Sequence, residues 1–132
     1  MKNKKIDGPQ AADDLSGLLK LIPDPVLLAT PEGVIIEVNE AALEAAGKSR
    51  RQIIGKGICQ IIHGGRWPHI KCPLEEFLLT RMAKSEDTRL PGLGGDYHLM
   101  ITPLVEGDAE IRLVMLQARK LSRAESLKVE SI

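Results

Sequence analysis

Aromatic side chains are almost absent from this chain. They make up 2% of its 132 residues, as one tryptophan, one tyrosine and one phenylalanine: Trp67, Tyr97 and Phe77. A chain with so few rings lacks the stacking platforms by which many proteins bind single-stranded nucleic acid. Its core must be built from leucine, isoleucine, valine and alanine, and a hydrophobic fraction of 43% is sufficient for one.

Net charge and long apolar runs are also missing. The 18 basic and 18 acidic residues cancel, so no overall field directs the chain to nucleic acid or to an anionic membrane. No apolar run reaches the roughly 18 residues that a membrane span needs. The basic start at residues 1–5 is not followed by the apolar segment of a secretory signal. We therefore expect a cytoplasmic protein with no direct nucleic-acid or membrane partner.

Signatures of common enzymes are absent as well. The chain has no G-x-S-x-G, no G-x-x-x-x-G-K-[ST] and no H-E-x-x-H sequence. The glycines of residues 92–95 lack the strand-then-helix context of a phosphate-binding loop. A Cys–His nucleophile pair is the one catalytic arrangement that the residues leave open. We expect that this chain is not an enzyme.

Hydrophobic periodicity predicts a single α+β domain over residues 11–120, preceded by a flexible polar tail at 1–10 and followed by the start of a helical linker at 121–132. The expected elements are a helix at 11–22, strands at 26–30 and 34–38, helices at 39–47, 49–54, 58–62 and 73–84, and strands at 88–90, 97–105 and 111–118. Two strands at the start and three at the end can share one antiparallel sheet, with the short helices on one face.

Particular residues mark the boundaries and faces of these elements. Asn39 is expected to cap a helix that Gly47 ends. Pro103 indicates a bulge or a sheet edge. His98 alternates with Tyr97, so we expect it on the outward side of its strand. The helix at 73–84 has an apolar face consisting of Leu74, Phe77, Leu78 and Met82.

The order of elements, together with four motifs, resembles the PAS family. The first motif is residues 21–39, with a strand, an acidic-Gly turn, a strand and an Asn that begins a helix. Residues 39–47 are similar to the family's N-x-A-A-x-x-x-x-G helix, residues 51–55 to its following turn, and residues 102–104 to its T-P-L strand ending. The resemblance covers about residues 12–120.

The resemblance implies a function as well as a fold. It implies a five-stranded antiparallel sheet with flanking N- and C-terminal helices, in a domain that senses signals and forms homodimers. The parent protein would be a bacterial or archaeal sensor histidine kinase or transcription regulator, with a C-terminal effector domain. The usual D-I-T triad at the end of the last strand is replaced by residues 117–119, Gln-Ala-Arg, so the coupling of strand to linker is expected to differ.

Residues 59–73, C-Q-I-I-H-G-G-R-W-P-H-I-K-C-P, resemble a PAS subgroup with a C-x3-H-G stretch before a P-C-x2-C-P stretch. His69 stands where that subgroup has its first paired cysteine. The candidate ligand or redox residues are Cys59, His63, Trp67, His69 and Cys72. Cys59, His63, His69 and Cys72 also form a candidate metal set, because thiolate and imidazole suit zinc or an iron–sulfur centre. Packing of the two cysteines and a reversible thiol–disulfide switch remain the alternatives.

The cofactor is not identified by these residues, and none is expected by default. Haem would have to use His63 or His69, and the sequence has no C-x-x-C-H stretch for covalent haem. Flavin is disfavoured because the region around Cys59 lacks the Asn, Arg and final Gln of blue-light PAS domains. Trp67 is expected to cover the core or to gate a ligand cavity.

An apolar helix face near the start supplies a candidate dimer contact, consisting of Leu15, Leu18, Leu19 and Ile22. A shift at such an interface would carry a signal from a small-molecule ligand or a redox change. The alternative function is a protein–protein interaction and dimerisation module that binds no ligand.

Overall fold

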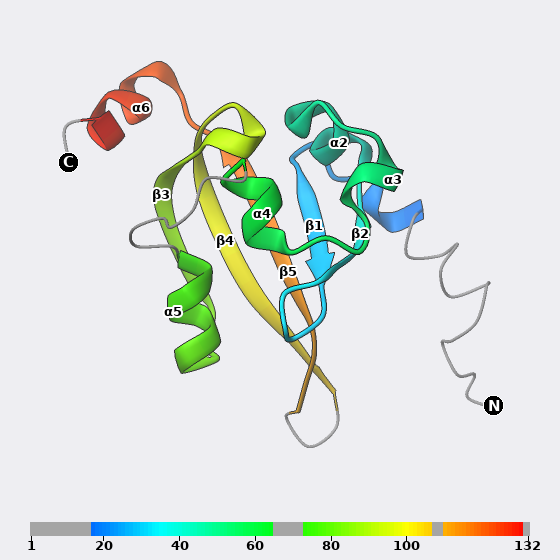
Figure 1. Cartoon of the computed structure of the whole chain (residues 1–132). Coiled ribbons are helices and arrows are strands. Elements are labelled where there is room, and N and C mark those ends of the chain that lie inside the picture. Colours follow the sequence, from blue (N-terminus) through cyan, green and yellow to red (C-terminus); the bar gives the residue numbers. More distant parts are fainter. Residues whose placement is uncertain (1–16, 65–72, 107–109, 131–132) are drawn as a thin grey trace.

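The computed structural model describes residues 17–64, 73–106 and 110–130. A short helical turn at 17–19 precedes the first strand. The elements that follow are β1 (Val26–Ala29), β2 (Ile35–Val38), α2 (Glu40–Ala46), α3 (Arg50–Ile53), α4 (Ile58–Ile62), α5 (Pro73–Thr80), β3 (Lys84–Leu90), the 3₁₀ turn η1 (Pro91–Leu93), β4 (Gly95–Glu106), β5 (Glu110–Lys120) and α6 (Arg123–Glu130). Figure 1 shows their arrangement.

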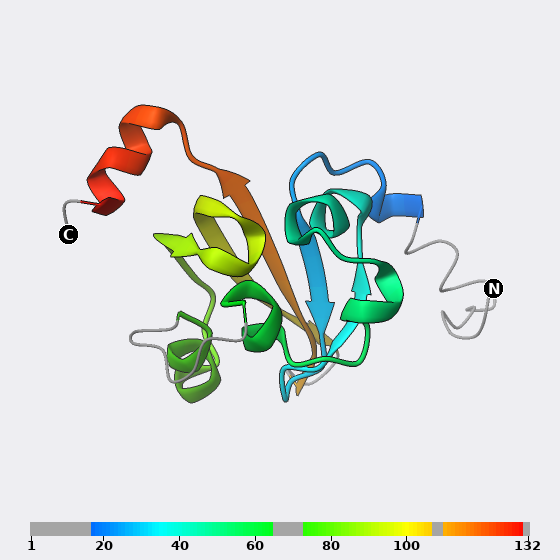
Figure 2. The ribbon, with the colours of Figure 1, turned by 45° about the horizontal axis from the view of Figure 1, so that its top comes forward.

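The strands form one antiparallel sheet in the order β2-β1-β5-β4-β3. The two N-terminal strands therefore pair with the three C-terminal ones, which confirms the predicted sheet and fold class. Helices α2 to α5 lie on one side of this sheet (Figures 1 and 2). The helix α6 follows the last strand at one end of the sheet.

The sheet and the helices meet in one large cluster of buried side chains. Leu27 and Leu116 contribute from the sheet, and Ile53, Ile62 and Phe77 contribute from the helices; each is at most 1% exposed. Aliphatic side chains dominate this cluster, as the composition predicts. Burial on this scale is the main stabilising term of the fold.

Strand β1 is buried on both faces, which explains its continuous apolar sequence. Leu27 and Ala29 belong to the large cluster beneath the helices. Val26 and Leu28 point to the other face, where they pack against Leu19. A strand that lies between two neighbours and is covered on both sides has no position for a polar side chain.

Asn39 ties the N-terminal turn to this arrangement. Its side-chain oxygen accepts hydrogen bonds from the N–H groups of Ala42, as the predicted N-cap, and of Val26, at 3.0 and 2.9 Å. Its amide nitrogen donates to the carbonyl oxygens of Ile22 and Asp24 at 3.1 and 2.8 Å. The side chain is buried, so these bonds replace its contacts with water.

Two sequence-based boundaries are wrong. The helix predicted to reach residue 84 ends at Thr80, because Arg81 adopts a positive φ of 62°. Met82 consequently lies outside the helix and is 68% exposed. Strand β3 begins at Lys84 rather than at residue 88. It is an edge strand with an exposed polar face, so its first residues lack the apolar pattern by which strands are recognised.

Other local predictions are confirmed. Gly47 ends α2 with a φ of 65°, the left-handed conformation that favours glycine. Pro103 lies beside a register shift between Leu104 and Val105. Pairing between β3 and β4 extends only to Ile101, so Pro103 occupies the part of β4 that has no partner on that side.

Candidate functional site

Helix α4 and its C-terminal cap carry the two described members of the predicted Cys/His cluster. Cys59 is half-buried against the main core, and His63 is buried at the C-terminal cap of α4. They are four residues apart, and the His63 N–H donates to the Cys59 carbonyl at 3.0 Å. Residues at this spacing lie on the same side of a helix. Trp67, His69 and Cys72 lie outside the described residues.

One thiol and one imidazole are half of a tetrahedral zinc site, which takes four ligands. Within 17–64, 73–106 and 110–130, no group of three or more potential metal ligands comes together. Completion of a metal site on Cys59 and His63 would therefore depend on the segment that follows Gly64 and contains His69 and Cys72.

The end of α4 is in unusually close contact with the turn η1. A Cβ atom added to Gly92 would lie 1.7 Å from the carbonyl oxygen of Ile61 and 2.8 Å from the nitrogen of Gly64. Only glycine permits this approach of two backbones. The turn η1 is therefore tightly packed. The contact joins the Cys/His helix to the β3–β4 connection.

Asp96 anchors the C-terminal helix to the same connection. Its carboxylate is buried and accepts hydrogen bonds from Arg89 on β3, with Nε to Oδ1 at 2.7 Å, and from the Ser126 hydroxyl on α6. Its carbonyl accepts the N–H of Leu121 at 3.0 Å. The hydrogen bond from Arg89 and, to a smaller extent, the one from Ser126 hold the pKa of the Asp96 carboxyl below its ordinary value.

Tyr97 and His98 occupy opposite faces of β4, as their alternation predicts. Tyr97 is buried, its hydroxyl donates to the Leu93 carbonyl at 2.8 Å, and burial raises its pKa. The His98 side chain is 29% exposed and its Nδ1 lies 2.6 Å from Asp87 Oδ1 on the neighbouring strand. The tyrosine thereby fastens η1 to the sheet next to Asp96.

The structure divides the predicted dimer face. Leu19 is 4% exposed and packs on the chain's own sheet with Ile22 alongside it, whereas Leu18 is 61% exposed. Leu15 lies outside the described residues. Leu21, which the sequence analysis did not include, is 77% exposed.

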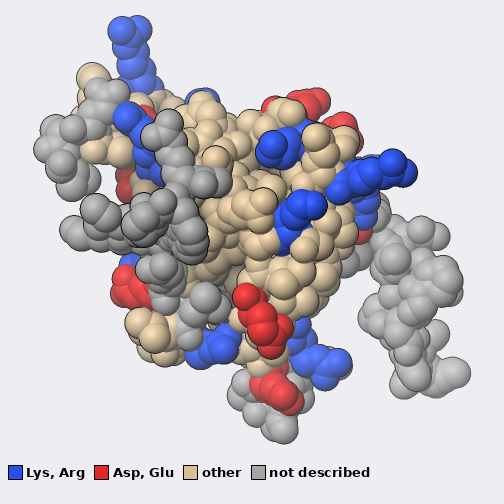
Figure 3. Space-filling view, in the orientation of Figure 1, with Lys and Arg blue, Asp and Glu red and all other residues tan. Residues whose placement is uncertain are grey.

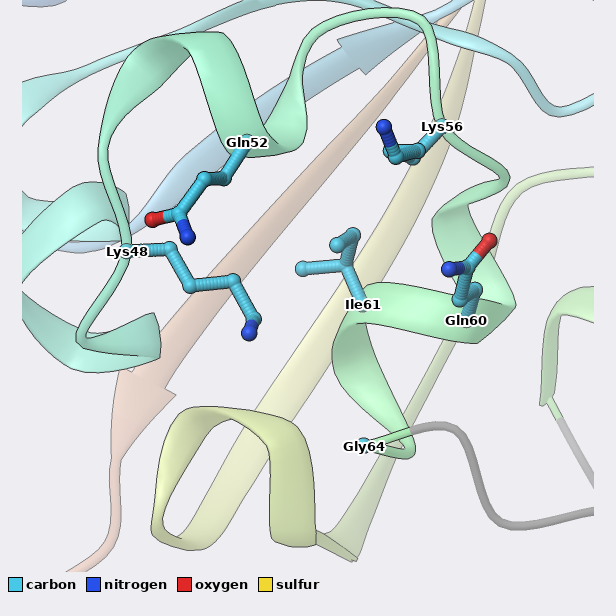
Figure 4. Close-up of a pocket in the computed structure, with 6 residues that line it drawn as sticks. All are labelled: Lys48, Gln52, Lys56, Gln60, Ile61 and Gly64. Atoms are coloured by element: carbon cyan, nitrogen blue, oxygen red, sulfur yellow. The ribbon is translucent and has the colours of Figure 1, made fainter.

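Sequence reasoning missed a groove beside α4. It is lined by Lys48, Gln52, Lys56, Gln60, Ile61 and Gly64 and has a volume of about 390 Å³ (Figure 4). A sequence signal exists: residues 48–72 contain six lysines and arginines and no aspartate or glutamate. Within the described segments, no helix is long and apolar enough to cross a membrane.

Comparison with known proteins identifies the fold and the family. No curated protein sequence matches the chain. The PAS domain of BvgS from Bordetella pertussis is 23% identical to this chain and superposes with a TM-score of 0.68. The alignment covers 90% of this chain and 93% of the BvgS domain.

Structures with lower sequence identity share the same fold. The PAS domain of the fruit-fly ELK potassium channel is 16% identical, with coverages of 85% and 98% and a TM-score of 0.63. A Rhodobacter sphaeroides LOV protein is 13% identical, with coverages of 95% and 74% and a TM-score of 0.69. Residues 23–117 match the sequence family described as PAS domain. This chain therefore belongs to the PAS domain family, whose members are sensory and interaction modules rather than catalysts.

Proposed function

We propose that this PAS domain is the cytoplasmic signal-input and dimerisation domain of a bacterial or archaeal sensor histidine kinase or transcription regulator. It detects a small ligand or a redox change around the α4–α5 connection and passes the change through α6 to an effector domain. The observation that carries this proposal is the attachment of α6 to Asp96, because an output helix held by a few polar contacts can be released or shifted.

The contacts at the start of α6 define its position on the sheet. Ser122 and Glu125 form a reciprocal cap, in which the Ser122 N–H donates to Glu125 Oε1 at 2.8 Å and the Glu125 N–H donates to Ser122 Oγ at 3.2 Å. Leu121 is buried immediately before the helix, whereas Leu127 is 58% exposed. The helix is thus fixed at its first turns and offers an apolar side chain farther along for another contact.

A continuous set of packed groups connects the Cys/His helix with α6. The end of α4 contacts Gly92, the turn η1 is bonded to Tyr97 through Leu93, and Asp96 is the neighbour of Tyr97. A contiguous path of this kind supports coupling, which a measurement on α6 must establish.

The sensing chemistry that we propose is reversible oxidation of Cys59 and Cys72. Two thiols lose two protons and two electrons as the disulfide bond forms, and a peroxide oxidant is reduced in the same step. The similarity of residues 59–73 to the cysteine-containing PAS subgroup supports this proposal. Binding of a metal ion by Cys59, His63, His69 and Cys72 is the second chemistry open to the same segment.

The test begins with the full chain purified without oxygen. Its absorption spectrum, metal content and thiol count are measured before and after peroxide treatment, with hydrogen exchange of α6 recorded in both states. We expect two thiols to be lost together and α6 exchange to change, and Cys59→Ala or Cys72→Ala to abolish both effects. Two reactive thiols that persist in peroxide, in a protein without metal or colour, would overturn the redox and metal proposals.

A ligand-free dimerisation module is the alternative function. It is favoured by the dense packing of the large core cluster, where side chains such as Ile53, Phe77 and Leu116 are fully buried. The exposed Leu18 and Leu21 would then provide the contact surface. A stable dimer whose α6 exchange responds to neither peroxide nor small molecules would support this alternative.

A further inference from the structure

The groove beside α4 brings four hydrogen-bond donors to one place. Lys48 and Gln52 lie on one side, Lys56 and Gln60 lie on the other, and Ile61 lies between them (Figure 4). The side-chain nitrogens of both glutamines are turned toward the groove. A volume of about 390 Å³ falls within the range of pockets that hold small molecules.

The position of Gln52 is set by the fold. Its Oε1 accepts the Ser49 N–H at 2.9 Å as part of the capping box of α3. Because the amide oxygen is used in this cap, the amide nitrogen is the group that faces the groove. One donor of the site is therefore held in place before any ligand arrives.

The two lysines of the groove differ from Lys84 in their ion pairing. Within the described part of the chain, neither Lys48 nor Lys56 has an ion-pair partner. Lys84, in contrast, lies 2.9 and 3.3 Å from the carboxylates of Glu76 and Glu86.

Two further basic side chains, Arg50 and Arg51, belong to α3, and Asp and Glu side chains lie above the basic ones in Figure 3. Arg50 and Arg51 line a second hollow with Ile54, and Arg50 is paired with Glu37. Figure 3 shows Lys and Arg side chains over this part of the surface. The whole chain has no net charge, so this positive region is a local feature of the fold.

We propose that the groove binds a small oxyanion with at least two negative charges, a phosphate or a carboxylate. Two ammonium groups on opposite sides suit a doubly charged ligand, and the two amide nitrogens donate to its remaining oxygens. The donors are exposed, so binding weakens as salt screens the charges. Neither Cys59 nor His63 lines this groove, although Gln60 and Ile61 belong to the same helix α4. The proposal that the groove binds an oxyanion does not depend on the proposed function. Only the transmission of oxyanion binding to α6 rests on that function.

Calorimetry on the full chain at low ionic strength tests the proposal, with pyrophosphate and citrate as probes. We expect one-to-one binding of at least one probe, and a comparison of the two distinguishes a phosphate from a carboxylate ligand. Lys48→Gln combined with Lys56→Gln should weaken binding by at least about tenfold. Lys20→Gln, which removes one positive charge from an exposed position before β1, should change it less than about twofold.

Two results would overturn the site: no binding of either probe at low salt, or an equal loss of affinity in the Lys20→Gln control. Hydrogen exchange of α6 separates this proposal from the proposed function. Binding without a change in α6 would support the groove and count against its use as a signal input. Absence of binding would leave the thiol experiment as the independent test of the sensory function.

Discussion

Arg89 on β3 and Asp96 on β4 are direct cross-strand partners, joined by two hydrogen bonds from the guanidinium to the two carboxylate oxygens at 2.7 and 3.3 Å. Such bidentate pairs fix geometry as well as charge. Because Ser126 donates to the same carboxylate, the pair connects the edge hairpin of the sheet to the C-terminal helix.

Acid should weaken this connection. The Asp96 pKa lies below its ordinary value, so this carboxyl contributes stability above its unfolded pKa of about 3.9 and loses that contribution as the pH falls through the folded pKa. We expect the urea midpoint to fall more steeply below about pH 4 in the wild type than in Asp96→Asn. Hydrogen bonds with Ser122 also lower the pKa of Glu125. Because Glu125 is present in both proteins, it does not account for a difference between them. Parallel pH curves for the two proteins would contradict the assigned role of Asp96.

Gly92→Ala should destabilise the fold strongly. The new methyl group would overlap the Ile61 carbonyl oxygen, and neither backbone can move without disturbing α4 or η1. We expect a loss of about 2 kcal/mol or more in the free energy of unfolding, measured by urea denaturation. Gly57→Ala is the matched control, because nothing lies within 4 Å of its added Cβ; its cost should stay below about 1 kcal/mol. Equal effects of the two substitutions would show that the contact is looser than described.

Asn39→Asp should detach the N-terminal turn while it preserves the cap of α2. An aspartate keeps the acceptor for the N–H groups of Val26 and Ala42 but loses the donor to the carbonyls of Ile22 and Asp24. We expect a loss of about 1–3 kcal/mol, because two part-buried carbonyls lose their donor and face a negative charge. Hydrogen exchange should increase at residues 19–24 and stay slow in α2. Faster exchange in α2 alone would contradict the link.

Leu18→Glu should weaken a homodimer without unfolding the protomer. Leu18 is 61% exposed, so a charge there costs little unless a partner covers it. Sedimentation velocity should show a shift from dimer toward monomer, with an unchanged thermal midpoint at concentrations where the protein is monomeric. Leu19→Glu is the contrasting variant and should unfold the protein, because Leu19 is buried on the sheet. A dimer that tolerates Leu18→Glu would exclude this face.

Local patterns determined most of the secondary structure and the topology of this PAS domain. Apolar runs marked β1 and β5, Asn39 and Gly47 marked the two ends of α2, and the order of elements led to the correct five-stranded sheet. These features depend on residues close together in the sequence, through capping bonds, turn conformations and the alternation of buried positions. The strand predicted at 88–90 lacked the first residues of β3, 84–87, because the polar outer face of this strand resembles a loop.

Tertiary structure decided which residues meet across the fold. The Asn39 side chain bonds to Ala42, to Val26 and to the carbonyls of the N-terminal turn, but the sequence around Asn39 predicts only the bond to Ala42, the helix cap. Gly92 is packed against Ile61 some thirty residues away, and Asp96 is bound by side chains from β3 and α6. Lys48 and Lys56 face one groove because the turns around α3 bring them there. Such contacts depend on how separate elements pack, and packing is determined by the shape and burial of the whole core rather than by any single segment.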